Sequence, residues 1–143
     1  MYAPVLEIDT RKVRENARRL HTFCGERGVE LAFVTKGFSA RPEVIRAAME
    51  GGITCFADSR MKNIISAKRA IPGLKYLLIR VPAPDEAEEV VRWADWSLQS
   101  QIEVIRAVSE AALRQGKVHA IILMIDLGDL REGVFGREQL DEI

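Results

Sequence analysis

The sequence has no excess of either charge and no long hydrophobic run. Its 21 lysines and arginines balance its 21 aspartates and glutamates, so the formal net charge is zero. A chain without a net positive field has no long-range attraction for nucleic acid or for an anionic membrane surface. The longest apolar run, AIILMI at residues 120–125, is far too short to span a bilayer, and the N-terminus does not resemble a signal peptide. We therefore expect a cytoplasmic protein that binds neither nucleic acid nor membrane.

Cysteine, histidine and the common cofactor motifs are also scarce or missing. The two cysteines, Cys24 and Cys55, are far apart and form no Cys-x-x-Cys or Cys/His pair, so we predict no metal site and two small buried thiols. No Gly-x-Gly-x-x-Gly follows a strand-like run, and no Walker-type phosphate loop is present. The familiar serine and cysteine nucleophile motifs are missing too. Any chemistry must therefore come from other side chains.

What the sequence does contain is a regular alternation of strand-like and helix-like segments. Five apolar, strand-like runs begin near Leu31, Ile53, Lys75, Trp96 and His119. Helical patterns lie between them, with Pro42 suited to open the first and Pro84 the third. Asp58 or Ser59 is placed to cap the second, and the residues SQIE, 100–103, form a capping box for the fourth. Before this series we predict a short strand at residues 5–9 and a helix capped by Asp9 or Thr10.

This alternation predicts an α/β fold with a parallel sheet, because parallel strands need crossovers of about this length. Two architectures fit. The first is a parallel (β/α) barrel of the TIM type, of which residues 1–143 would form only the first five of eight units. The second is an open five-stranded doubly wound sheet, complete at this length. A helix that begins after Gly136 and stops within about two turns favours the partial barrel.

Lys36 is the first candidate for a functional residue. Of six lysines it alone lies at the carboxyl end of a core strand, where both architectures bind ligands. Burial there would disfavour the ammonium form, and a neutral amine can attack a carbonyl to form a Schiff base. The alternative from position alone is a lysine that reaches solvent or pairs with Asp58 on the neighbouring strand.

Other polar side chains follow the later strands at the same predicted edge. Arg131 lies in the loop GDLREG between two glycines, and a guanidinium there could hold a phenolate or carboxylate. A loop salt bridge is the alternative for Arg131, and helix caps or solvated charges are the alternatives for the rest. The remaining candidates are Asp58, Ser59, Arg60, Arg80, Ser97, Gln99 and Asp126.

Taken together, these segments resemble a known family. Residues 31–64, LAFVTKGFSARPEVIRAAMEGGITCFADSRMKNI, are similar to the first βαβα segment of the alanine-racemase-like pyridoxal-phosphate (PLP) barrel enzymes. LLIRVP, SLQSQIEVIRAVSEAALRQGKVH and IILMIDLGDLREGVF look most like the branch of ornithine and related amino-acid racemases. In that family the lysine that ends the first barrel strand carries PLP as an internal aldimine, and Lys36 matches it. Arg131 matches the arginine that contacts the phenolic oxygen of the cofactor in alanine racemases.

The resemblance implies a PLP-dependent amino-acid racemase in which Lys36 also acts as one base in abstraction of the α-proton. Asp58, Ser59 and Arg80 become tentative contacts to substrate or cofactor. The rest of the barrel, the phosphate-binding loops, the second base and a C-terminal β-domain would lie beyond residue 143. The intact protein would then be a homodimer that acts on a small amino acid, and residues 1–143 alone would be inactive.

The sequence also departs from alanine racemases in the narrow sense. Gly37, Phe38 and Ser39 follow Lys36, where those enzymes have Ala-(Asn/Asp)-Ala-Tyr-Gly-His, so the tyrosine that helps to hold the phosphate is missing. Non-catalytic PLP-binding homeostasis proteins of the same barrel family lack this tyrosine as well, and such a protein is the alternative function. A third hypothesis is a five-stranded binding module that uses no cofactor.

Overall fold

The computed structural model describes residues 4–143, which build one five-stranded parallel sheet. Its strands are β1 (Ala32–Val34), β2 (Cys55–Asp58), β3 (Lys75–Leu78), β4 (Trp96–Gln99) and β5 (Ala120–Leu123). They lie side by side in the order β1-β2-β3-β4-β5, and each neighbouring pair is parallel. Sequential order without a reversal is the arrangement of a (β/α) barrel wall. The partial barrel is therefore confirmed, and the doubly wound sheet, which needs a reversal of strand order, is wrong.

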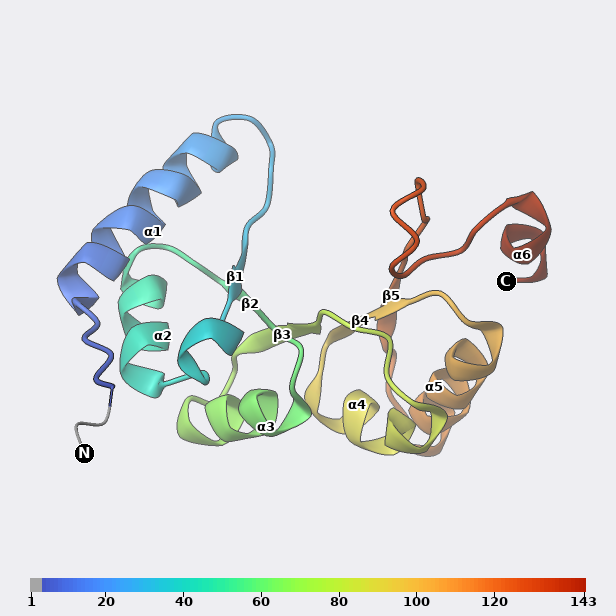
Figure 1. Ribbon diagram of the computed structural model, residues 1–143. Coiled ribbons are helices and arrows are strands. Elements are labelled where there is room, and N and C mark those ends of the chain that lie inside the picture. The colour runs from blue at the N-terminus through green and yellow to red at the C-terminus, as the bar shows by residue number, and fades with distance from the viewer. Residues whose placement is uncertain (1–3) are drawn as a thin grey trace.

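Helices follow the strands along one side of the sheet. Figure 1 shows α2 to α5 in a row on the same side of the strands, each after the strand that precedes it in the chain. The helices are α1 (Thr10–Gly25), α2 (Pro42–Glu50), α3 (Met61–Ala70), α4 (Ala87–Trp93), α5 (Ile102–Arg114) and α6 (Arg137–Glu142). Two short 3₁₀ helices, η1 (Lys36–Phe38) and η2 (Pro84–Glu86), follow β1 and precede α4.

The core lies between the sheet and these helices. Phe33, Phe56 and Tyr76 occupy matching positions on β1, β2 and β3, so their rings line up across the sheet. The centroid of the Phe56 ring lies 6.1 Å from that of Phe33 and 5.9 Å from that of Tyr76. Ile45 of α2 and Ile64 of α3 are fully buried in the same cluster. The alternation of strand side chains therefore places one set in this core and turns the other set to the opposite side of the sheet.

Two local predictions are wrong at the ends of elements. Residues 5–9 form no strand, and Val5 and Leu6 are 82% and 72% exposed, because no strand of the described chain lies beside them to supply hydrogen bonds. The capping box at residues 100–103 is not formed: α5 begins at Ile102, after Gln101, whose side chain makes no cap bond. Asp9, by contrast, caps α1 as predicted, and its Oδ1 accepts the N–H groups of Arg11 (2.9 Å) and Lys12 (3.3 Å).

The two edge strands carry exposed apolar side chains. Within the described part of the chain, β1 pairs with β2 alone and β5 with β4 alone. Val34 on β1 and Ile121 and Ile122 on β5 are exposed, although such residues are usually buried in strands. Open, apolar edges are what five units of a barrel wall present, since further strands would cover them.

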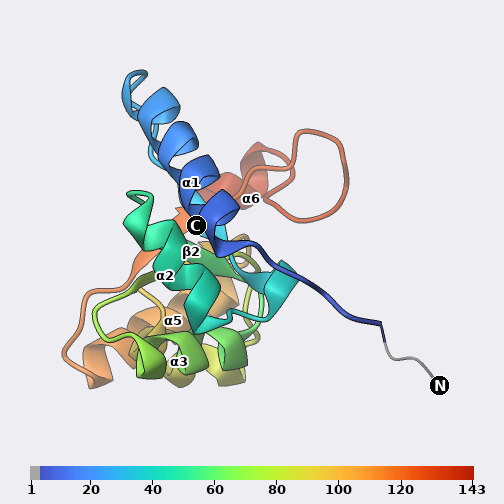
Figure 2. The same cartoon turned by 90° about the vertical axis from the view of Figure 1, so that its left-hand side faces the viewer.

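The contact between α1 and α2 depends on Gly51 at the end of α2. Both views of the chain show α1 lying across α2 (Figure 1, Figure 2). A Cβ atom on Gly51 would lie 2.6 Å from the Cβ of Ala17 and 2.6 Å from the carbonyl oxygen of Arg14, both on α1.

We therefore expect Gly51→Ala to lower the free energy of unfolding by about 1–3 kcal/mol through forced separation of the helices. Urea unfolding followed by circular dichroism measures this. Gly25→Ala is the matched control, because a Cβ at Gly25 meets nothing within 4 Å. Equal midpoints for the two variants would contradict the close contact.

Candidate functional site

Lys36 lies at the carboxyl edge of the sheet, as predicted. It begins η1, two residues after the last residue of β1, and its side chain is exposed. Among residues 4–143, no hydrogen bond or ion pair involves its amine. The expected desolvation is thus wrong for this chain, because β1 is an edge strand and nothing described here covers the end of it. The alternative, a pair with Asp58, is wrong too, since the Asp58 carboxylate has other partners.

Asp58 is fully buried and faces the helices. Its Oδ2 accepts a hydrogen bond from Thr35 Oγ1 (2.7 Å) and another from Asn63 Nδ2 (3.1 Å). Its Oδ1 accepts the backbone N–H of Arg60 at 2.9 Å. Tyr76 Oη lies 3.4 Å from Thr35 Oγ1 and completes a buried polar group around Thr35, the residue that precedes Lys36. This geometry corrects the expectation of direct ligand contact by Asp58, which holds the ends of β1 and β2 and the start of α3 instead.

This buried group of hydrogen-bonded side chains was not predicted from the sequence. Thr35, Asn63 and Tyr76 were not among the predicted site residues. A usable signal was the alternation along β1, because Thr35 lies two residues after Phe33 and must face the same side. Burial on that side makes a hydrogen-bonded partner obligatory, and Asp58 at the end of the adjacent strand can supply one.

Arg80 and Ser59 tie together the loops that follow β2 and β3. Arg80 Nε donates to the carbonyl oxygen of Ser59 at 2.8 Å. Its two terminal nitrogens donate to the two carboxylate oxygens of Glu86 in η2, at 2.7 and 2.6 Å. These hydrogen bonds hold the pKa of the Glu86 carboxyl below its usual value. Arg80 is half-buried, and its guanidinium is held in a bidentate ion pair with Glu86. The same guanidinium therefore orders the loops after β2 and β3.

Arg131 lies in the loop after β5. This loop, like Lys36, is at the carboxyl end of the strands, but β5 and β1 are the two outermost strands of the sheet, so the two residues follow strands on opposite sides of it. The loop folds back on itself: Val134 N–H donates to the Met124 carbonyl at 2.8 Å, and Asp126 N–H donates to the Val134 carbonyl at 3.0 Å. The Oδ1 of Asp126 accepts the Gly128 N–H at 2.7 Å, which lowers the pKa of this carboxyl. Arg131 is exposed, and the loop salt bridge considered as its alternative is not formed within the described chain.

Ser97 and Gln99 were predicted to follow β4, and this is wrong. Both lie within the strand and are fully buried on the helix side. Gln99 Nε2 donates to Ser97 Oγ at 2.9 Å, and Ser97 Oγ lies 3.0 Å from Nε2 of His119. His119 precedes β5 and so stands at the amino edge of the sheet, as predicted. These three residues therefore form an internal polar chain that runs along β4, from His119 at the amino edge to Gln99, the last residue of the strand.

His119 makes stability depend on pH. Burial lowers the pKa of its imidazole below the ordinary value of 6.5. As pH falls below about 6.5, the unfolded chain takes up this proton first, so the free energy of unfolding decreases until the folded state is protonated as well. We expect the urea midpoint to fall between pH 7 and pH 5.5, and to fall less in His119→Gln. An identical pH dependence in wild type and variant would contradict this role.

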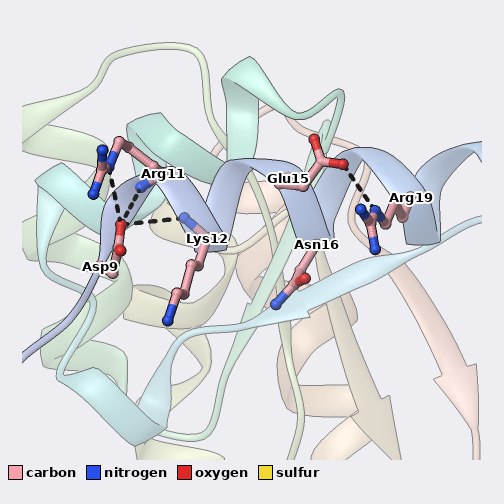
Figure 3. Close-up of a pocket in the computed structure, with 6 residues that line it drawn as sticks. All are labelled: Asp9, Arg11, Lys12, Glu15, Asn16 and Arg19. Atoms are coloured by element: carbon pink, nitrogen blue, oxygen red, sulfur yellow. Dashed lines mark hydrogen bonds and ion pairs between the residues drawn. The ribbon is translucent and has the colours of Figure 1, made fainter.

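Two hollows in the surface of residues 4–143 lie away from the edge that carries Lys36. One, of about 400 Å³, lies along α1, and Figure 3 shows Asp9 and Glu15 each facing an arginine. Asp9 approaches Arg11 at 3.6 Å, and Glu15 approaches Arg19 at 2.8 Å, which is the pattern of a solvated helix face. A larger one, of about 1270 Å³, reaches Lys75 and the residues before β1, at the amino end of the strands.

Residues 4–143 contain neither a cluster of metal-binding side chains nor a helix that could cross a membrane. They hold no group of three or more histidine, cysteine, aspartate or glutamate side chains suited to a metal ion. Nor does any helix in this range have the length and hydropathy needed to cross a membrane. Cys24 and Cys55 are free and half-buried, less enclosed than predicted.

The family model and the curated relatives that match this chain point to the same family. The family model described as alanine racemase, N-terminal domain, matches residues 8–143. Ornithine racemase of Acetoanaerobium sticklandii is 37% identical over 139 residues, which are 97% of this chain and 39% of that protein. Lysine racemase of Thermotoga maritima is 33% identical over 143 residues, all of this chain and 40% of that protein. The chain thus spans about two fifths of the length of the curated relatives it matches.

A solved structure of similar shape is PipY of Synechococcus elongatus with PLP bound. It aligns with a TM-score of 0.73 at 21% sequence identity, over 88% of this chain and 60% of that one. At this identity the likeness shows the fold alone, and it agrees with the strand order described above.

Proposed function

Because the chain belongs to the family of the alanine racemase N-terminal domain, we propose that residues 1–143 are the N-terminal part of the barrel of a PLP-dependent amino-acid racemase. The observation that carries this is the match over residues 8–143 together with two relatives named as racemases. Those relatives are named for ornithine and lysine, which both bear a second amine on the side chain. We propose a substrate of that class.

Lys36 is the residue that we propose holds the cofactor. Its amine is exposed at the carboxyl edge of the sheet and is engaged by no partner within residues 4–143, so an aldehyde can reach it. The donor chemistry therefore fits PLP, an aldehyde that condenses with primary amines. Arg131 is likewise exposed and unpaired in the described chain, and its guanidinium can hold the phenolic oxygen of PLP.

When bound, PLP supplies an electron sink that stabilises negative charge at the α-carbon of an amino acid. The chain itself must supply a group that moves the α-proton. Lys36 Nζ can remove or return that proton on one face of the α-carbon, as a general base and acid. Ser59 and Arg80 order the neighbouring rim, and we keep both as candidates for contact with the substrate or cofactor. We further propose that the intact protein is a cytoplasmic homodimer.

A second candidate is a non-catalytic PLP-binding protein. The observation in its favour is the sequence Gly37-Phe38-Ser39 after Lys36, which lacks the tyrosine expected of an alanine racemase. Both candidates use Lys36 in the same way, so they differ only in whether a substrate proton is moved.

Proton exchange at the α-carbon separates the two candidates. The full-length protein, saturated with PLP, is incubated with L-ornithine, L-lysine or L-alanine in deuterated water, and deuterium at the α-carbon is followed by NMR. We expect exchange and loss of optical rotation with ornithine or lysine, and much less with alanine. PLP binding without exchange on any of the three would instead support the non-catalytic protein.

A further inference from the structure

We propose that Thr35 and Asp58 are a positioning pair, which holds a strained turn so that Lys36 leaves the sheet in one fixed direction. The inference rests on the proposed role of Lys36. It assigns a function to a fully buried polar group that the proposed mechanism does not use.

The turn that carries Lys36 is unfavourable on its own. Ser39 and Ala40 follow η1 with φ angles of 54° and 51°, so two consecutive residues with side chains adopt the left-handed conformation. Contact between Cβ and the following carbonyl oxygen disfavours this conformation in every residue except glycine. Such residues persist only where the surroundings hold them, and they cluster at functional sites. Ala40 is 2% exposed and packs into the core, which fixes the far end of the turn.

Thr35 fixes the near end of the turn. Its carbonyl oxygen accepts the N–H of Phe38 at 3.2 Å and the N–H of Ala40 at 3.1 Å, so it holds the turn just before the strained pair and at the second residue of that pair. Its own N–H donates to the carbonyl of Ala57 on β2 at 2.8 Å. The backbone on either side of Lys36 is therefore tied to Thr35.

The side chain of Thr35 is in turn held by Asp58. Thr35 Oγ1 donates to Asp58 Oδ2 at 2.7 Å and, in the same geometry, can accept from Tyr76 Oη at 3.4 Å. Burial raises the pKa of Tyr76 to about 12, so its hydroxyl remains a donor at ordinary pH. Asn63 and the Arg60 N–H occupy the rest of the carboxylate. Removing one partner leaves a buried carboxyl group short of a donor, which the surroundings must relax to satisfy.

The direction in which Lys36 leaves the backbone depends on this group, because within residues 4–143 its exposed amine makes no hydrogen bond or ion pair that could orient it. The pair therefore acts on the amine through the backbone. A displacement of about 1 Å in a reacting group can reduce its rate by about 100-fold.

The test compares Thr35→Val, which removes the hydroxyl at nearly constant shape, with Thr35→Ser, which keeps it. Ser97→Ala is the matched control, because it removes another fully buried hydroxyl of the same sheet, far along the strand order from Lys36. Each full-length protein is treated with PLP and borohydride, and the rate of labelling at Lys36 is divided by that at the exposed Lys12 by peptide mapping. We expect this ratio to fall by about tenfold or more in Thr35→Val and to be unchanged in Thr35→Ser and Ser97→Ala. Equal ratios in Thr35→Val and Ser97→Ala would overturn the proposal.

Amide hydrogen exchange without PLP gives a second readout that does not need labelling. The Phe38 and Ala40 N–H groups should exchange faster in Thr35→Val and at the wild-type rate in Ser97→Ala. If Thr35→Val fails to fold, Asp58→Asn replaces it in both measurements, and unchanged exchange at Ala40 would refute the pair. Absence of label at Lys36 in the wild type would refute the proposed function alone, because exchange still decides whether Thr35 and Asp58 hold the turn.

Discussion

Replacing Lys36 with alanine is expected to lower the rate of α-proton exchange in the full-length protein by about 10²–10⁴-fold or more, since the change removes a general acid–base group together with the amine that holds PLP. The same variant should lose the absorbance of a lysine-bound PLP. Because Lys36 is exposed, its truncation should leave the stability of the fold within about 0.5 kcal/mol of the wild type. The loss would therefore report chemistry rather than folding.

Lys12→Ala is the matched control for this loss. Lys12 is also an exposed lysine, but it lies on α1, where it lines the charged hollow of Figure 3. We expect wild-type exchange in Lys12→Ala. Exchange that survives in Lys36→Ala, or that falls equally in both variants, would rule out the assigned role of Lys36.

The second large effect concerns the aromatic core that supports the same strands. Phe56 is fully buried and lies between Phe33 and Tyr76, so its truncation removes contacts across three strands and leaves a cavity. We expect Phe56→Ala to lower the free energy of unfolding by about 3–5 kcal/mol, measured by urea unfolding.

Phe23→Ala provides the comparison for Phe56→Ala. Phe23 is 56% exposed on α1, and the guanidinium of Arg27 lies over its ring, 3.8 Å from the centroid. Its loss should cost less than about 1 kcal/mol. Equal losses in the two variants would mean that the core is not centred on Phe56.

Much of the fold could be predicted from the sequence because its signals are local and periodic. All five strands fall where the apolar runs place them, and Pro42 begins α2 as expected. Pro84 begins the 3₁₀ helix η2 instead, and α4 follows it from Ala87. The position of Lys36 at the carboxyl edge follows from the same periodicity. Sequential strand order could not be derived from these signals, since a doubly wound sheet uses the same alternation of elements.

The site was less predictable because polar residues have several possible partners. Asp58 could equally face the ligand edge or the helices, and only the register of β2 against β1 and β3 decides that it meets Thr35. Ser97 was placed after β4, although the strand continues to Gln99 and turns both side chains inward. Residues 5–9 have the composition of a strand, but a strand forms only beside a partner. In each case tertiary pairing overrides a local pattern.

The most direct test of the central claim is to identify the residue that binds PLP. The full-length protein is mixed with PLP, reduced with borohydride and digested, and the modified peptide is mapped by mass spectrometry. We expect a phosphopyridoxyl group on Lys36, in stoichiometric amount and absent from Lys36→Ala. Stoichiometric modification of another lysine in place of Lys36, or no modification at all, would contradict the assignment of Lys36 and with it the proposed racemase.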